Sequence, residues 1–149
     1  MIRPLYSVRL VRDGGVPSYG RVRTSDDVVR LFQPLLHEEP GEVFLVIGMS
    51  AKGDMLGAHV ASRGILNSAL IEPREVFRFA IVANAASVIL IHNHPSGDPT
   101  PSQEDLLMTG RMLRAADIMG IPIFDHIIIS SAGASVSMQE NGLLRHSDS

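Results

Sequence analysis

Apolar and polar residues alternate along parts of this chain with the two-residue period of a β-strand. Residues 5–12 (LYSVRLVR) show this alternation, which predicts a half-buried strand. Residues 42–61 hold two strand-like apolar runs around a Lys-Gly turn, which predicts a hairpin. Residues 86–92 are apolar on both faces, as in a central strand covered on both sides. A last strand is expected in residues 121–130, paired with a short run near 135–138.

Helical spacing and cap residues predict three helices between these strands. Thr24 and Asp27 form a capping box that opens the first helix, and Pro34 should bend or shorten it. Its inward positions would be Val28, Leu31, Phe32 and Leu35. The second helix should begin at Pro73 and the third should cover about 102–119. Helices and strands that alternate around one mixed sheet predict an α/β sandwich.

Composition narrows the classes of protein to which the chain can belong. Its 149 residues fit one domain, with an N-terminal strand and helix in residues 1–41 and a core in 42–145. The chain has no cysteine, which excludes disulfides, a thiolate nucleophile and a cysteine-based zinc site. A net charge of −3 does not indicate a nucleic-acid-binding protein. No apolar run is long enough for a membrane span and no secretory signal is present, so we expect a cytoplasmic protein.

Two histidines stand where the central strand ends. Side chains two residues apart on a strand point to the same face, so His92 and His94 present two imidazoles in one direction. The carboxyl end of such a strand is where α/β sheets place ligand crevices. Asp105 lies in the first turn of the next helix, at the head of a stripe predicted to face inward. That stripe continues through Met108, Met112, Ala115 and Met119.

A buried, ionised carboxylate needs a cation or several donors. Two histidines and an aspartate, with a fourth position open to water, are typical of a catalytic zinc site. A simpler interpretation is that Ser102 and Asp105 form only a helix capping box. Both can hold, because one carboxylate oxygen can cap the helix while the other binds a metal.

The motif His92-x-His94-Pro95, followed by Ser102-x-x-Asp105, resembles the metal-binding signature of the JAB/MPN (JAMM) metalloproteases. The wider stretch from LNSALIEPREVF to HNHPSGDPTPSQED, with IFDHIII further on, resembles the bacterial RadC branch of that superfamily. This resemblance implies a three-layer α/β/α, cytidine-deaminase-like fold and one Zn²⁺ held by His92, His94 and Asp105. It also implies a water-activating glutamate, for which Glu42 is the best position.

Glu38 and Glu39 compete with Glu42 for that role, but they belong to a helix end where solvated carboxylates are usual. The expected reaction is hydrolysis of a peptide or isopeptide bond, with Glu42 as general base and Ser102 as oxyanion donor. His126 is expected to support the site by hydrogen bonding rather than to bind the metal. Base deamination is excluded, because the related deaminases need H-x-E and a pair of cysteines.

Two further functions stay open at this point. One is a RadC-like DNA repair or DNA-processing factor, such as a metal-dependent nuclease or a protein that associates with single-stranded DNA. Residues 1–41 show no helix-hairpin-helix pattern, however, and the acidic balance gives nucleic acid no support. The other is an interaction module with a structural zinc. The protein or peptide substrate is not identified by the sequence, and an exposed sheet edge would allow a homodimer.

Overall fold

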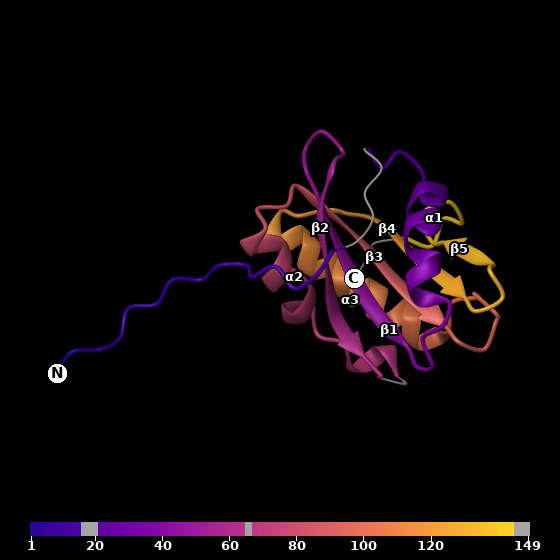
Figure 1. Cartoon of the computed structure of the whole chain (residues 1–149), viewed down its shortest axis with the longest axis horizontal. Coiled ribbons are helices and arrows are strands. Elements are labelled where there is room, and N and C mark those ends of the chain that lie inside the picture. Colours follow the sequence, from indigo (N-terminus) through magenta and orange to yellow (C-terminus); the bar gives the residue numbers. More distant parts are fainter. Residues whose placement is uncertain (16–20, 65–66, 145–149) are drawn as a thin grey trace.

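The computed structural model describes residues 1–15, 21–64 and 67–144 (Figure 1). It contains five strands, which are β1 (Val43–Met49), β2 (Met55–Arg63), β3 (Ser87–His94), β4 (Ile123–Ser130) and β5 (Ser135–Ser137). It contains three α-helices and one 3₁₀ turn, which are α1 (Ser25–Leu36), α2 (Pro73–Val82), α3 (Gln103–Met119) and η1 (Ser68–Leu70). Among these residues no helix is long and apolar enough to cross a membrane.

The strands form one mixed sheet in the order β2-β1-β3-β4-β5. β3 pairs antiparallel with β1 and parallel with β4. A parallel pair needs a crossover connection, and α3 provides it between β3 and β4. β3 therefore lies in the middle of the sheet, with seven of its eight residues buried. This confirms the predicted hairpin, the central strand and the late strand pair.

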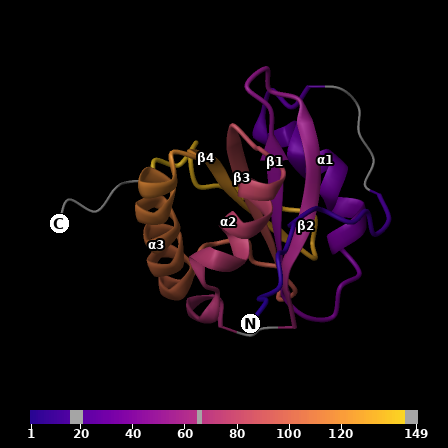
Figure 2. The ribbon, with the colours of Figure 1, turned by 90° about the vertical axis from the view of Figure 1, so that its left-hand side faces the viewer.

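Helices cover both faces of the sheet and make three layers, which confirms the predicted fold class (Figure 2). α1 lies on one face, over a core cluster that includes Phe32, Ile47 and Ile91. α2 and α3 lie on the other face, over a cluster that includes Phe77, Leu90 and Met112. Leu90 and Ile91 are neighbours on β3 and enter opposite clusters, because side chains alternate along a strand.

The caps form as the sequence predicts, but the buried faces of two helices are rotated from the prediction. In α1 the last inward residue is Leu36, and Leu35 is 44% exposed. In α3 Ala116 is buried, whereas Met119 is 49% exposed. The buried residues of both helices follow a spacing close to 3.6 residues per turn. Near the helix ends they are therefore displaced by one or a few positions from those predicted. Pro34 is accommodated inside α1, two residues before its end.

The predicted strand over residues 5–12 is wrong for this structure. No strand is assigned in this stretch, and its side chains are exposed (Figure 1). Leu5 is 99% exposed and Val8 is 77% exposed. The alternating pattern is present in the sequence, but within one chain it has no partner among the residues that the structure describes.

Candidate metal centre

The side chains of His92, His94 and Asp105 meet on the α3 face of the sheet. His92 and His94 end β3, and Asp105 lies in the first turn of α3. The two Nε2 atoms are 3.0 Å apart. Asp105 Oδ2 lies 3.0 Å from His94 Nε2, and Asp105 Oδ1 lies 3.3 Å from His92 Nε2. The structure thus brings together the three residues that were predicted as metal ligands.

These donor atoms suit a small divalent cation. A tetrahedral zinc site with bonds of about 2.0–2.1 Å has donor-to-donor distances of roughly 3.3 Å, close to those found here. The side chains of His92 and Asp105 are only 2% and 3% exposed. Burial raises the pKa of Asp105, but its hydrogen bonds with His92 and His94 outweigh burial and hold this pKa well below its usual range. The site therefore carries a buried negative charge that faces two imidazole nitrogens.

Hydrogen bonds on the far side of each ring leave both Nε2 atoms free to act as ligands. His94 Nδ1 lies 2.9 Å from the carbonyl oxygen of Asp98, which can only accept, so Nδ1 carries the proton. The Asp105 carboxylate raises the pKa of His94, so a proton and a metal ion compete for its Nε2.

His92 is oriented by three successive hydrogen bonds that run through His126 and Thr109 to α3, and we call them the relay behind His92. Thr109 Oγ donates to the carbonyl oxygen of Asp105 at 2.7 Å, so it accepts from His126 Nδ1, also at 2.7 Å. His126 Nε2 then accepts from His92 Nδ1 at 2.7 Å. Complete burial holds the pKa of His126 well below its usual range, which keeps this ring neutral. His126 therefore lies behind His92 and orients it.

Asp105 caps α3 and faces the histidines at the same time. Its Oδ2 accepts from the Ser102 backbone N–H at 2.9 Å, and its own N–H donates to Ser102 Oγ at 3.1 Å. The capping interpretation and the metal interpretation of this spacing thus coexist. Because Ser102 Oγ accepts in the cap, its hydroxyl proton remains available to donate into the cleft.

Glu42 directly precedes β1 and lines the same cleft as His94, Ser102 and Asp105. Burial raises the pKa of the Glu42 carboxyl above its ordinary value. The competing glutamates lie elsewhere: Glu38 is exposed, and Glu39 pairs with Arg63. Glu42 is thus the candidate that shares a cavity with the metal group.

Asn93, the residue between the two histidines, forms hydrogen bonds to the backbone on both sides of Glu42. Asn93 Oδ1 accepts from the Val43 N–H at 2.6 Å, and Asn93 Nδ2 donates to the Gly41 carbonyl oxygen at 3.0 Å. The Glu42 carbonyl oxygen accepts from the Gly64 N–H at 2.7 Å. Both peptide groups that flank Glu42 are therefore fixed, and the one after it is held at its N–H and at its carbonyl oxygen. Sequence reasoning assigned no role to Asn93, although its place in the motif was a signal.

The cleft has a volume of about 560 Å³ and opens to solvent. Four carboxylates line it, which are Glu42, Asp98, Glu104 and Asp105. No lysine or arginine is among its described lining residues. Asn67 and Ser68, at the start of η1, form another part of its wall. No sequence pattern pointed to these two, because η1 is brought to the site by packing against α3.

Comparison with known proteins shows the family to which the chain belongs. Residues 22–143 match the family model of the RadC-like JAB domain. This chain belongs to the RadC-like JAB domain family. It is 42% identical over 125 residues to a UPF0758 protein of Methanosarcina barkeri, and 43% identical over 123 residues to one of Desulforamulus reducens. These matches cover 84% and 83% of this chain but 54% of each relative, so the chain spans about half the length of these curated relatives.

The relay behind His92 should set the metal affinity of this RadC-like JAB domain. We expect Thr109→Val to weaken zinc binding by up to about 10-fold, the low end of the effect of losing a direct partner of a ligand histidine, because His126 loses the contact that fixes its tautomer while His92 keeps His126. Thr109→Ser keeps the hydroxyl and should bind zinc like the wild type. Competition with a chromophoric chelator measures both dissociation constants. Equal affinities for the valine and serine variants would show that the relay does not orient His92.

The two hydrogen bonds from Asn93 to the backbone of Val43 and Gly41, which we call the Asn93 clamp, should contribute to the stability of the fold. We expect Asn93→Leu to lower the free energy of unfolding by about 1–3 kcal/mol per buried group left unpaired, here an N–H and a carbonyl. Urea denaturation measures this loss, and hydrogen exchange should show faster exchange of the Val43 amide. Unchanged exchange at Val43 in the folded variant would contradict the clamp.

Proposed function

We propose that this chain is a zinc-dependent metallopeptidase-type hydrolase that cleaves a peptide or isopeptide bond with water. The observation that carries the proposal is the shared cleft. The donor residues His94 and Asp105 line it together with the Glu42 carboxyl, whose pKa is raised, and with Ser102. The third donor residue, His92, lies buried beside them, with its Nε2 3.3 Å from Asp105 Oδ1. Membership of the RadC-like JAB family supports the proposal, because the JAB superfamily includes metalloproteases.

His92, His94 and Asp105 would hold the zinc ion. When bound, zinc acts as a Lewis acid and brings the deprotonation of water close to neutral pH. Three protein donors leave a coordination position for water or substrate, whereas structural zinc sites are closed by four protein ligands. The donor set therefore favours a hydrolase over an interaction module with a structural zinc.

Glu42 would move the proton. A carboxylate whose pKa is raised by burial is a better general base than an exposed one, and it can return the proton to the leaving amine. The Asn93 clamp holds the backbone of Glu42 so that its side chain enters the cleft from β1. Ser102 would donate its hydroxyl proton to the carbonyl oxygen as negative charge develops there.

The charges in the cleft disfavour the alternative of a DNA-processing factor. Nucleic-acid affinity depends mainly on lysine and arginine contacts to phosphates. The described lining residues offer carboxylates instead, with Asp98 and Glu104 on the exposed rim. A phosphate backbone would thus meet repulsion at the point where the chemistry takes place.

Glu42→Gln should separate metal binding from turnover. We expect this variant to keep its zinc and to lose at least about a hundredfold in hydrolysis, because general base catalysis typically contributes 10²–10⁴-fold. A mixed library of peptides and isopeptide-linked peptides, read by mass spectrometry, measures cleavage across many candidate bonds at once.

Glu38→Gln is the matched control, because it makes the same chemical change at an exposed glutamate outside the cleft. It should cleave like the wild type. Wild-type cleavage by a folded, zinc-loaded Glu42→Gln protein would exclude Glu42 as the base.

A further inference from the structure

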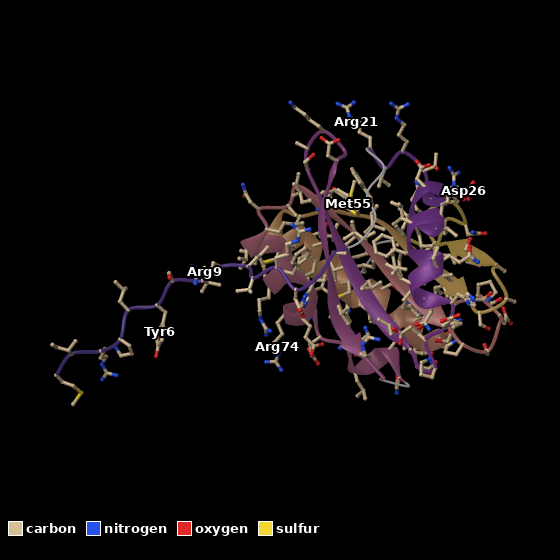
Figure 3. The ribbon with its side chains drawn as sticks, viewed as in Figure 1. Tyr6, Arg9, Arg21, Asp26, Met55 and Arg74 are labelled. Carbon is tan, nitrogen blue, oxygen red and sulfur yellow. The ribbon has the colours of Figure 1, made fainter. Side chains whose placement is uncertain are left out.

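Residues 5–12 have the alternating pattern of a strand, but their side chains are exposed. Tyr6, Val8 and Leu10 would share one face of an extended strand, and the other face would carry Ser7 and Arg9 between Leu5 and Val11. Tyr6 and Val8 are 81% and 77% exposed, and the segment projects away from the sheet (Figures 1 and 3). Exposed, contiguous apolar side chains of this kind mark an interaction site.

The sheet offers a matching edge at β2. β2 is one of the two edge strands of the described sheet and is nine residues long, whereas the other edge strand, β5, has three residues. Leu56 and Val60 lie on its α1 face, the face to which Ala58 also belongs, and are 49% and 40% exposed. They stay uncovered because α1 packs over β4 on the other side of β1. An open edge with apolar side chains is a template for one more strand.

If the one bridge that the structure describes before α1 were continued as an antiparallel register, residues 5–11 would lie beyond the end of their own β2. Arg21 forms an antiparallel bridge with Asp54 next to the hairpin turn. Nine residues back from Arg21 is Arg12, and nine forward from Asp54 is Arg63, the last residue of β2. This register would lay residues 12–20 on β2; their sequence holds three glycines and a proline, residue types that are depleted in strands.

We propose that residues 5–12 add as a strand to the β2 edge of a second copy of this chain, and that the second copy does the same in return. Main-chain hydrogen bonds would hold each added strand, as in other cases of strand addition. Tyr6, Val8 and Leu10 would cover the partner's Leu56 and Val60. Reciprocal exchange of an identical segment gives a closed, two-fold dimer.

Light scattering on this 149-residue chain tests the proposal. The wild type should reach a mass of twice 16.1 kDa as its concentration rises. Val8→Lys places a charge on the apolar face and should give a monomer at the same concentrations. Ser7→Lys adds the same charge to the opposite face and should remain a dimer.

Mixing two monomeric variants separates exchange between chains from any other dimer. Val60→Lys should block the acceptor edge and also give a monomer. A mixture of Val8→Lys and Val60→Lys retains one intact segment and one intact edge, and should recover the dimer mass at high concentration. Hydrogen exchange should show protection of residues 5–12 and of β2 in the dimer alone.

Three results would overturn the proposal. The first is a wild type that stays monomeric throughout, whether residues 5–12 are exposed or protected by their own chain. The second is a dimer that Val8→Lys leaves intact, since another surface would then hold it. The third is a failure of the two folded, monomeric variants to associate when mixed. Circular dichroism of each variant verifies the fold independently of dimerisation.

Discussion

The buried carboxylate of Asp105 is the constraint on which the candidate site depends. An ionised group that is almost wholly removed from water costs several kcal/mol unless cations or donors surround it. Here it faces two imidazole nitrogens and accepts a backbone N–H at the start of α3. A divalent cation between the same atoms would balance the charge that the fold concentrates there. The other polar contacts of the site serve to keep these atoms in place.

The topology of the sheet explains how distant residues come together. The parallel β3–β4 pair requires a crossover, and the start of that crossover brings Asp105 to the end of β3. One turn later on the same helix, Thr109 reaches His126 on β4, which in turn orients His92 on β3. The antiparallel β1–β3 pair then brings Glu42 to the same end of the sheet, where Asn93 fixes its backbone. Each element next to β3 thus supplies either a residue of the candidate site or its support.

The sequence predicts the positions of the candidate site residues well where they lie in a short motif, and less well where their contacts depend on packing. The alternation of side chains along a strand predicts that His92 and His94 share one face, and helical spacing predicts that Asp105 points inward. The roles of Thr109 and Asn93 depend on which atoms meet across α3, β4 and β1, and a local pattern does not determine that. The inward faces of α1 and α3 were misplaced only near their ends, where a small error in helical period accumulates. Residues 5–12 show the opposite case, a clear strand pattern without a partner in its own chain.

The metal content of purified protein tests the proposed centre most directly. Plasma mass spectrometry should find about one zinc per chain in the wild type and in Asp98→Ala, which removes an exposed carboxylate from the same cleft. His92→Ala and Asp105→Ala should lose the zinc while remaining folded by circular dichroism. A wild type that contains no zinc, and takes up none when it is offered, would contradict the metal centre and leave Asp105 as a helix cap alone.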